Sequence, residues 1–180
     1  GKNKLFGDIA ISGAKNAVLP LMAAAILNDR ALTITNVPKL SDSITMANLI
    51  KGMGGEVSFD SSSIVIDPKN LNTPYAPYEL VKTMRASFYV LGPLVARFGE
   101  AKVSLPGGCA WGPRPVDFHI EGLKKLGIDI SLEAGYVVAK SKKIIGNKIV
   151  FPKISVGATG NVLMAAVLAE GDTEIHNAAA

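Results

Sequence analysis

The chain has 180 residues, of which 48% are hydrophobic, with a net charge of +4 and a single cysteine. A chain of this length can bury a sizeable core, and one cysteine cannot form an internal disulfide, so a disulfide-stapled secreted domain is excluded. The longest apolar run, residues 17–27, is shorter than the roughly 20 residues that span a membrane. The basic residues are dispersed along the chain, without the aromatic interleaving of a nucleic-acid platform. We therefore expect a soluble cytoplasmic domain with no membrane span and no nucleic-acid partner.

An internal repeat organises the chain. The same order of features, a polar helix opening, an apolar run, a turn and an alternating strand, occurs in residues 12–37, 83–107 and 156–177. In this alignment Lys15 and Arg85 occupy equivalent positions. Such self-similarity predicts supersecondary units that pack on one another.

The apolar runs of the three copies predict buried helices. Residues 17–27, 88–96 and 162–169 are hydrophobic on every face rather than along one stripe. Helices that are buried all round imply that the sheets lie outside them. Pro93 falls within the second run, where it should kink or interrupt the helix because it lacks a backbone N–H.

In the first copy, a second, amphipathic helix follows the predicted strand. It covers residues 43–53, with Asp42 expected as its N-cap. Two alternating segments, residues 56–59 and 63–66, then predict a pair of short strands.

The second copy repeats this pattern. Its amphipathic helix is expected to begin at Pro115, a favourable first helical residue, and to stop at Gly127. Strands are predicted over residues 129–132 and 136–140. The repeating unit is therefore βαβαββ, present twice, and a third unit that begins at about Val150 is expected to be incomplete.

A glycine- and proline-rich loop interrupts the repeat in its second copy. Six of the ten residues from 106 to 115 are Gly or Pro, and Cys109 lies among them. A free cysteine is usually a small buried hydrophobe, but a loop of this composition belongs at the surface. Cys109 is therefore a candidate functional thiol that could donate a proton or attack as a thiolate, with Arg114 available to tune it or to hold an anion.

Polar or cationic residues precede each apolar run. The segments are residues 12–16, 82–87 and 153–159. Free N–H groups at helix N-termini attract anions, and Lys15 and Arg85 would reinforce that effect. Each segment alone could be an ordinary solvated cap, but the repeat would bring the openings together on one rim suited to phosphates and carboxylates.

Two polar residues open the helix after the cysteine loop. Asp117 is explained by the helix dipole alone, and His119 is either a partly buried helix residue or an acid/base group. Cys109, His119 and His176 form no zinc pattern, and the chain has no dinucleotide-binding or Walker motif. We predict neither a metal nor a cofactor.

Four segments together resemble the UDP-N-acetylglucosamine enolpyruvyl transferase family. They are residues 105–120, 12–20, 78–87 and 155–159. The resemblance implies an α/β fold of the inside-out barrel type, built of βαβαββ repeats and truncated here. It also implies that residues 1–14 pack with a second domain that the chain lacks, and that residues 15–180 form the first repeat domain.

The resemblance implies a reaction as well. The family transfers the enolpyruvyl group of phosphoenolpyruvate to the 3-hydroxyl of UDP-N-acetylglucosamine, with release of phosphate, in the first committed step of peptidoglycan synthesis. Because further groups come from the second domain, these 180 residues alone should not turn over. A non-catalytic module that binds nucleotide sugars is the alternative.

Site residues are implied by the same motifs. Cys109 would be the proton donor, also able to bond to phosphoenolpyruvate and to fosfomycin, and Lys15 and Asn16 would contact phosphoenolpyruvate. The residues that would contact the sugar nucleotide are Arg85, Arg114, Pro115, Val116, Asp117, Phe118, Lys153, Ile154, Ser155 and Val156. Trp111 and Pro113 replace the smaller residues usual in this loop.

Overall fold

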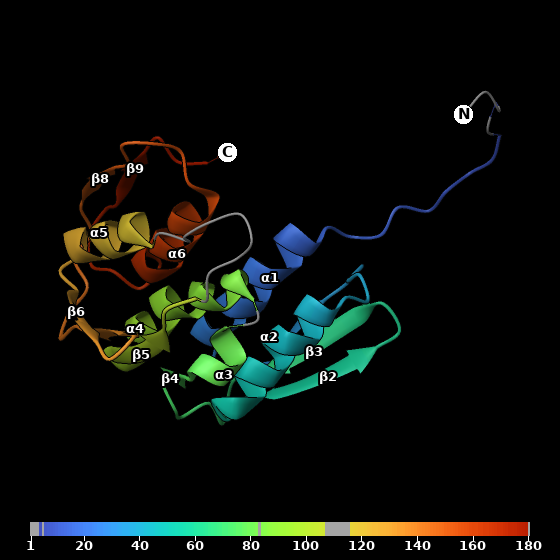
Figure 1. The fold of residues 1–180 in the computed structure, drawn as a ribbon, viewed down its shortest axis with the longest axis horizontal. Helices are drawn as coiled ribbons and strands as arrows, with labels where there is room; N and C mark the ends of the chain where they lie inside the picture. Colours follow the sequence, from blue (N-terminus) through green and yellow to red (C-terminus); the bar gives the residue numbers. More distant parts are fainter. Residues whose placement is uncertain (1–3, 5, 83, 107–115, 180) are drawn as a thin grey trace.

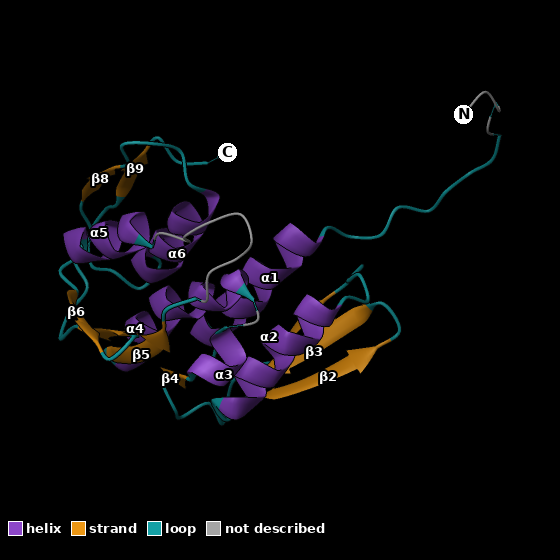
Figure 2. Cartoon of the chain, viewed as in Figure 1, coloured by secondary structure: helices purple, strands orange, loops and turns teal. Residues whose placement is uncertain are grey.

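The structure is a computed structural model that describes residues 4, 6–82, 84–106 and 116–179. Helices occupy the middle of the molecule and short strands lie around them (Figure 2). This layout confirms the expectation that the sheets lie outside the helices.

Helices and strands alternate along the chain (Figure 1). The helices are α1 (Lys15–Ala24), η1 (Ala25–Leu27), α2 (Ser41–Gly52), α3 (Tyr78–Val81), η2 (Arg85–Val90), α4 (Leu91–Phe98), α5 (Asp117–Lys125) and α6 (Val156–Ala166), of which η1 and η2 are 3₁₀ helices. The strands are β1 (Leu32–Ile34), β2 (Glu56–Asp60), β3 (Ser63–Asp67), β4 (Tyr75–Ala76), β5 (Glu100–Ser104), β6 (Asp129–Glu133), β7 (Tyr136–Lys140), β8 (Lys148–Val150) and β9 (Glu174–His176).

The strand order reveals the repeat. One sheet has the order β4-β5-β7-β6, a second has the order β1-β3-β2, and β8 pairs with β9. β4 is parallel to β5 as β8 is to β9, and β5 is antiparallel to β7 as β1 is to β3. The second copy is therefore a full βαβαββ unit, as the sequence predicts, and both predicted strand pairs are confirmed. The first copy is not a full unit within the described residues, because no strand precedes α1 there.

Strand register places one apolar row of each sheet against the helices. Ile34 pairs with Ile64 in the first sheet, and Val103 pairs with Val137 in the second. Ile64, Val103 and Val137 are fully buried. Because side chains alternate along a strand, this register leaves the intervening residues on the outer face.

Pro93 breaks the second buried helix, as its sequence position predicts. The first part is the 3₁₀ helix η2, and the second part is α4, of which Pro93 is the third residue. The first N–H groups of an α-helix have no intrahelical partner, so proline is tolerated in this turn.

The expectation that the apolar helices are buried all round is wrong. Leu21 on α1 and Leu163 on α6 are about half exposed, and Val167 and Leu168 after α6 are also exposed. Among the described residues, α4, α5 and η2 pack against α6 and cover only part of its circumference. The apolar face on the remaining side is left open.

Two predicted helix starts are also displaced. α2 begins at Ser41 with Leu40 as its N-cap, so Asp42 is not the cap and lies in the first turn instead. α5 begins at Asp117 rather than at Pro115, which lies outside the described residues. Its end is as predicted, because the chain leaves the helix through Gly127 at a φ of 81°.

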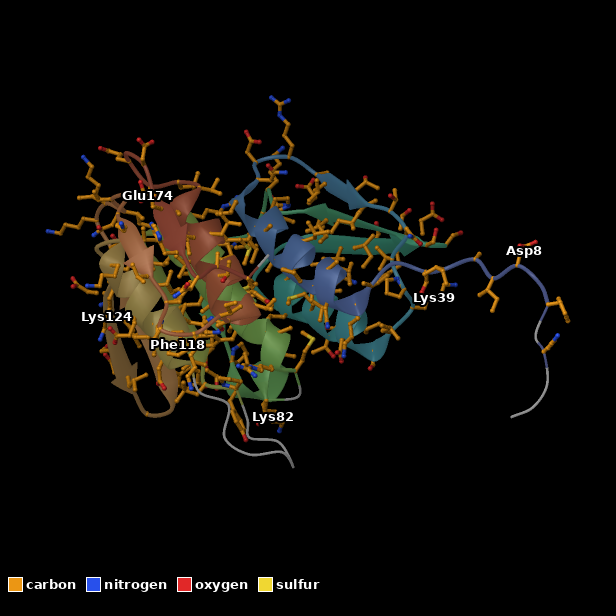
Figure 3. The ribbon with its side chains drawn as sticks, turned by 90° about the horizontal axis from the view of Figure 1, so that it is seen from above. Asp8, Lys39, Lys82, Phe118, Lys124 and Glu174 are labelled. Carbon is orange, nitrogen blue, oxygen red and sulfur yellow. The ribbon has the colours of Figure 1, made fainter. Side chains whose placement is uncertain are left out.

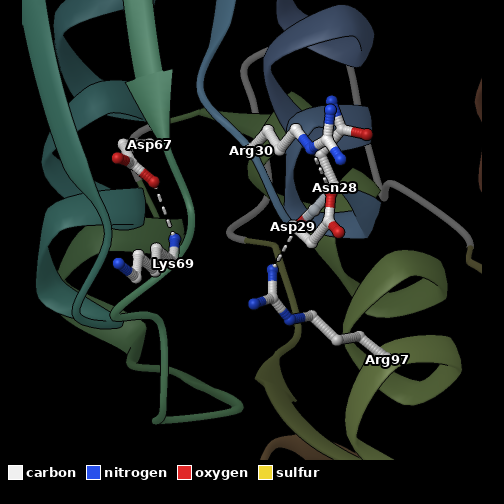
Figure 4. Close-up of polar contacts among 6 residues, drawn as sticks. All are labelled: Asn28, Asp29, Arg30, Asp67, Lys69 and Arg97. Carbon is white, nitrogen blue, oxygen red and sulfur yellow. Dashed lines mark hydrogen bonds and ion pairs between the residues drawn. The ribbon is translucent and has the colours of Figure 1, made fainter.

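Arg97, in the second copy of the repeat, forms hydrogen bonds with the backbone of the first copy. Its guanidinium, on α4, donates to the carbonyl oxygens of Ile26, Asn28 and Pro68 at 2.7, 2.8 and 3.0 Å, and Figure 4 shows the bond to Asn28. These carbonyls lie in or just after η1 and β3, where a carbonyl oxygen has no hydrogen-bond donor from its own helix or strand, and Arg97 supplies one.

The described residues before α1 form an extended segment that leads away from the helices (Figure 1). Phe6 is 90% exposed, Ile9 and Ile11 are also exposed, and Asp8 stands clear of the body in Figure 3. Packing of residues 1–14 against a second domain stays a prediction. Within the described part of the chain, no helix is long and apolar enough to cross a membrane.

Candidate functional site

The predicted site residues that the structure describes lie where helices open. Lys15 and Asn16 begin α1, and Arg85 begins η2. Val116 is the N-cap of α5, and Ser155 is the N-cap of α6. The predicted helix openings are therefore confirmed, whereas Cys109, Arg114 and Pro115, together with Trp111 and Pro113, lie outside the described residues.

The opening of α6 is capped by a side chain. Ser155 Oγ accepts a hydrogen bond from the backbone N–H of Ala158 at 3.3 Å. Lys153, Ile154 and Val156 beside it are exposed to solvent. The cap fixes the chain direction at the point where these side chains enter the helix.

The opening of α5 combines buried and exposed groups. Val116 is buried, Asp117 is exposed in the first turn, and Phe118 is half-buried. The Phe118 ring lies 6.5 Å from that of Phe151, which is buried directly after β8. Asp117 therefore stays in solvent while its neighbours anchor the turn.

His119, on the same turn, is buried and neutral. It is 6% exposed, and its ring meets the edge of Phe88 at a centroid distance of 5.2 Å. Burial, with a smaller effect from the charge of Arg85, lowers its pKa from 6.5 to about 4. Its Nδ1 lies 3.1 Å from the side-chain nitrogen of Asn161 on α6. A neutral imidazole between helices is consistent with the first of the two predicted roles, a buried helix residue.

His119 brings three helix openings together. The charge of Arg85, the first residue of η2, acts on both His119 and Tyr89. A Cβ atom placed on Gly157, in the first turn of α6, would lie 3.0 Å from the His119 ring. The openings of η2, α5 and α6 thus meet at His119, so two of the three openings expected to share a rim lie together, and the opening of α5 joins them instead of that of α1.

Lys15 forms an ion pair within the chain. Its Nζ lies 2.9 Å from Asp42 on α2, the residue that the sequence assigned to capping. The two side chains are partly exposed, and Asn16 is exposed beside them. A carboxylate already balances the charge of Lys15, so the α1 opening differs from the three that meet at His119.

Asn161 is the residue of this cluster that sequence reasoning missed. It is fully buried and hydrogen bonded on both sides of its carboxamide. A polar residue directly before the apolar stretch that begins at Val162 was the available signal. A buried amide needs partners, so its position already implied a specific contact.

A hollow of about 450 Å³ lies elsewhere, on the sheet that contains β5 and β7. Tyr75 and Lys102 are among its lining residues, and Tyr75 Oη lies 3.1 Å from Tyr136 Oη. No described site residue lines this hollow. The described residues also contain no group of three or more His, Cys, Asp or Glu side chains that could hold a metal ion. The helix openings, with their N–H groups and cations, are the part of the described chain best suited to bind anions.

A comparison with known protein families shows to which family the chain belongs. The model of the family described as EPSP synthase (3-phosphoshikimate 1-carboxyvinyltransferase) matches residues 1–180. The chain belongs to the EPSP synthase family. This confirms the kinship with enolpyruvyl transferases that the four sequence segments indicate.

Two curated relatives within the EPSP synthase family are similar over the whole chain. Both are named UDP-N-acetylglucosamine 1-carboxyvinyltransferase: one from Acinetobacter guillouiae is 54% identical over 99% of the chain, and one from Chlorobium limicola is 52% identical over 100% of it. The chain spans 43% of the length of each relative.

Solved structures of the EPSP synthase family share the fold. The enolpyruvyl transferase NikO from Streptomyces tendae matches 97% of the chain with a TM-score of 0.83 at 21% identity. An EPSP synthase from Acinetobacter baumannii matches 94% of it with a TM-score of 0.73 at 18% identity. The chain covers 41% and 40% of these structures, respectively. The expected enolpyruvyl transferase fold is thus confirmed over the described part of the chain.

Proposed function

We propose that the full-length protein transfers the enolpyruvyl group of phosphoenolpyruvate to the 3-hydroxyl of UDP-N-acetylglucosamine. The observation that carries this proposal is the identity of 54% and 52%, over essentially the whole chain, with two proteins named for that reaction. EPSP synthase structures share only 18% of the sequence, so their likeness supports the fold and not their acceptor.

The proposed reaction exchanges one bond for another at a single carbon. An ether bond forms between the sugar oxygen and C2 of phosphoenolpyruvate, the bond from C2 to the phosphate oxygen breaks, and the proton lost by the sugar hydroxyl leaves with the phosphate. A proton added to the methylene carbon in the addition step is lost again in the elimination step. Cys109 is the proposed proton donor in this scheme, because a thiol of ordinary pKa is protonated at neutral pH.

The proposed ligands fit the electrostatics of the helix openings. Phosphates and a carboxylate carry negative charge, which backbone N–H groups at the start of a helix and nearby cations stabilise. Lys15 and Asn16 are the proposed contacts of phosphoenolpyruvate. The proposed contacts of the sugar nucleotide are Arg85, Arg114, Pro115, Val116, Asp117, Phe118, Lys153, Ile154, Ser155 and Val156.

The choice of acceptor can be tested directly. We expect the full-length protein to release phosphate from phosphoenolpyruvate when UDP-N-acetylglucosamine is supplied, and not when shikimate 3-phosphate replaces it. Phosphate release with shikimate 3-phosphate alone would overturn the proposed acceptor. Residues 1–180 by themselves should release none, since they span 43% of the relatives' length and further groups would come from the remainder.

The role of Cys109 separates the enzyme from a non-catalytic nucleotide-sugar binding module. Intact-mass measurement after fosfomycin treatment should show one adduct on the full-length protein and none on Cys109→Ser. Tight binding of UDP-N-acetylglucosamine without an adduct or turnover would favour the binding module. The enzyme would act at the first committed step of peptidoglycan synthesis. It would do so in the cytoplasm, where both proposed substrates would be available.

A further inference from the structure

A side chain from α6 completes the broken helix of the second copy. In a continuous α-helix the N–H of Gly92 would donate to the carbonyl of Phe88, four residues earlier. The structure breaks the helix between η2 and α4 at this point. Asn161 Oδ1 instead accepts from Gly92 N at 2.6 Å, and Asn161 Nδ2 donates to Phe88 O at 2.9 Å. The carboxamide therefore takes the place of the missing helical hydrogen bond.

These two backbone groups fix which way the Asn161 amide faces. If the amide were turned over, its oxygen would face the carbonyl of Phe88 and its nitrogen would face the N–H of Gly92. Neither pair can form a hydrogen bond, and all of these groups are buried, where an unmet polar group is costly. The orientation of Asn161 is thus set by the backbone of another helix.

The fixed amide in turn sets the tautomer of His119. The second hydrogen of Asn161 Nδ2 points to His119 Nδ1, 3.1 Å away. Because the amide nitrogen can only donate, Nδ1 must accept, and the proton of the neutral ring resides on Nε2. That edge of the ring faces Gly157 in the first turn of α6.

Two glycines make room for this arrangement. A Cβ on Gly92 would lie 2.2 Å from the backbone oxygen of Asn161, far inside contact distance. A Cβ on Gly157 would press on the His119 ring at 3.0 Å. A hydrogen atom at Gly92 is needed for α4 and α6 to approach closely enough for Asn161 to reach its partners, and the one at Gly157 leaves the His119 ring undisturbed.

We propose that Asn161 is a positioning residue that ties the openings of η2, α5 and α6 together through Phe88, Gly92 and His119. By bonding to Phe88, Gly92 and His119 at once, Asn161 holds the helices that begin with Arg85, Asp117 and Val156 in their relative places, and the same bonds fix the Nε2–H tautomer of His119. The proposal deepens the proposed function and rests on it for its ligand, since these three residues are the candidate contacts of the nucleotide sugar. We call this set of hydrogen bonds, from Asn161 to Phe88, Gly92 and His119, the tie. The α1 opening, with Lys15 and Asn16, is not part of it.

The tautomer can be measured without substrate. We expect ¹⁵N spectra of the histidine-labelled full-length protein near neutral pH to show His119 with Nδ1 bare and Nε2 protonated, assigned by the signal lost in His119→Asn. A bare Nε2 or a doubly protonated ring in the unaltered protein would overturn the proposal. The measurement is made on the unaltered protein, and His119→Asn is needed only to assign the signal.

Asn161→Asp provides the decisive comparison. A carboxylate can accept from Gly92 but cannot donate to Phe88 or His119, so it should draw the His119 proton to Nδ1 and raise the pKa of that ring. Arg85 is the charged group that acts on His119 among the described residues, whereas Phe88, Asn161 and Gly157 are uncharged. An unchanged tautomer would contradict the tie. Asn48→Asp, on the exposed side of α2, is the matched control.

Kinetics of the full-length protein test the consequence for ligand binding. His119→Leu should raise the KM for UDP-N-acetylglucosamine by about tenfold, the effect of losing one buried hydrogen bond, with less effect on the KM for phosphoenolpyruvate. His119→Asn retains an acceptor near Nδ1 and should restore most of the loss. Equal changes in both KM values would overturn the positioning role, and His176→Asn, at an exposed histidine, is the control.

The two proposals fail in different ways. If the unaltered protein shows no turnover with UDP-N-acetylglucosamine, the proposed function is wrong, yet the tautomer and its change in Asn161→Asp still decide the tie. If turnover is present and the tautomer is not the expected one, the proposed function stands and the tie is wrong.

Discussion

The two kinds of helix opening in this molecule are held in contrasting ways. The first residue of α1, Lys15, forms a partly exposed ion pair with Asp42 at 2.9 Å. The openings of η2, α5 and α6 are joined by buried, uncharged hydrogen bonds through His119 and Asn161. The openings at Lys15 and Arg85, which are equivalent in the repeat, are therefore stabilised by different interactions.

The two kinds of helix opening should respond differently to salt and to substitution. A solvent-exposed ion pair contributes little to stability and weakens in salt. A buried polar network cannot exchange its partners for water, so removing or crowding one member is costly. The region around His119 should accordingly be rigid and intolerant of substitution, while the α1 opening should tolerate change and leave Lys15 able to exchange Asp42 for an anionic ligand.

The largest effect is expected from Gly92→Ala. The new methyl group would meet the backbone of Asn161 at 2.2 Å, so α4 and α6 would have to separate and the bond to the Gly92 N–H would break. We expect the free energy of unfolding to fall by about 3 kcal/mol or more, measured by urea denaturation of the full-length protein. Gly52→Ala is the control, because its methyl would make only an ordinary contact with Leu80 at 3.5 Å. Equal losses in the two variants would contradict close packing at Gly92.

The next effect is the pH dependence contributed by His119. Its pKa is lowered to about 4 in the folded protein, so the unfolded chain takes up the proton first as the pH falls. The stability from the neutral ring is full above about pH 6.5 and is lost as the pH falls from 6.5 toward 4, a loss of about 3 kcal/mol at 1.36 kcal/mol per pKa unit. Urea denaturation over this range should be flatter for His119→Asn than for the unaltered protein. Parallel profiles would show that His119 is not the group responsible.

A smaller effect is expected at the cap of α6. Ser155→Ala removes the acceptor of the Ala158 N–H and should lower the free energy of unfolding by about 1 kcal/mol. Ser58→Ala, on the exposed face of β2, should change it much less. The cap also orients Lys153 and Val156, so the affinity for UDP-N-acetylglucosamine, measured by calorimetry, should weaken in Ser155→Ala and not in Ser58→Ala.

The smallest effect is expected from the ion pair of the α1 opening. Asp42→Asn should change the free energy of unfolding by less than about 1 kcal/mol, and raising the salt concentration to about 1 M should remove the difference. A double-mutant cycle with Lys15→Met isolates the pair. A coupling as large as the effect of Gly92→Ala would remove the contrast between the two kinds of opening.

Much of the architecture followed from local patterns. The alternation over residues 63–66 and 136–140 gave both strand pairs, and the apolar runs gave the central helices, because side-chain period follows directly from backbone geometry. Pro93 marked the helix break, because a proline has no N–H to donate to the carbonyl four residues earlier. The cap at Asp42 was wrongly predicted, because α2 begins one residue earlier than Asp42 and the carboxylate instead pairs with Lys15, far away in the sequence.

The sequence by itself determined the repeat, the positions of the helix openings and the kinship with enolpyruvyl transferases, all of which depend on residue type and spacing. Only the tertiary structure decided which openings meet, which flank of α6 stays exposed, and that Asn161 replaces a hydrogen bond in a helix 69 residues away. The physical reason is that hydrogen bonds between buried side chains and distant backbone depend on how closely helices approach. That approach is fixed by glycines and packing in three dimensions, and a linear pattern does not record it.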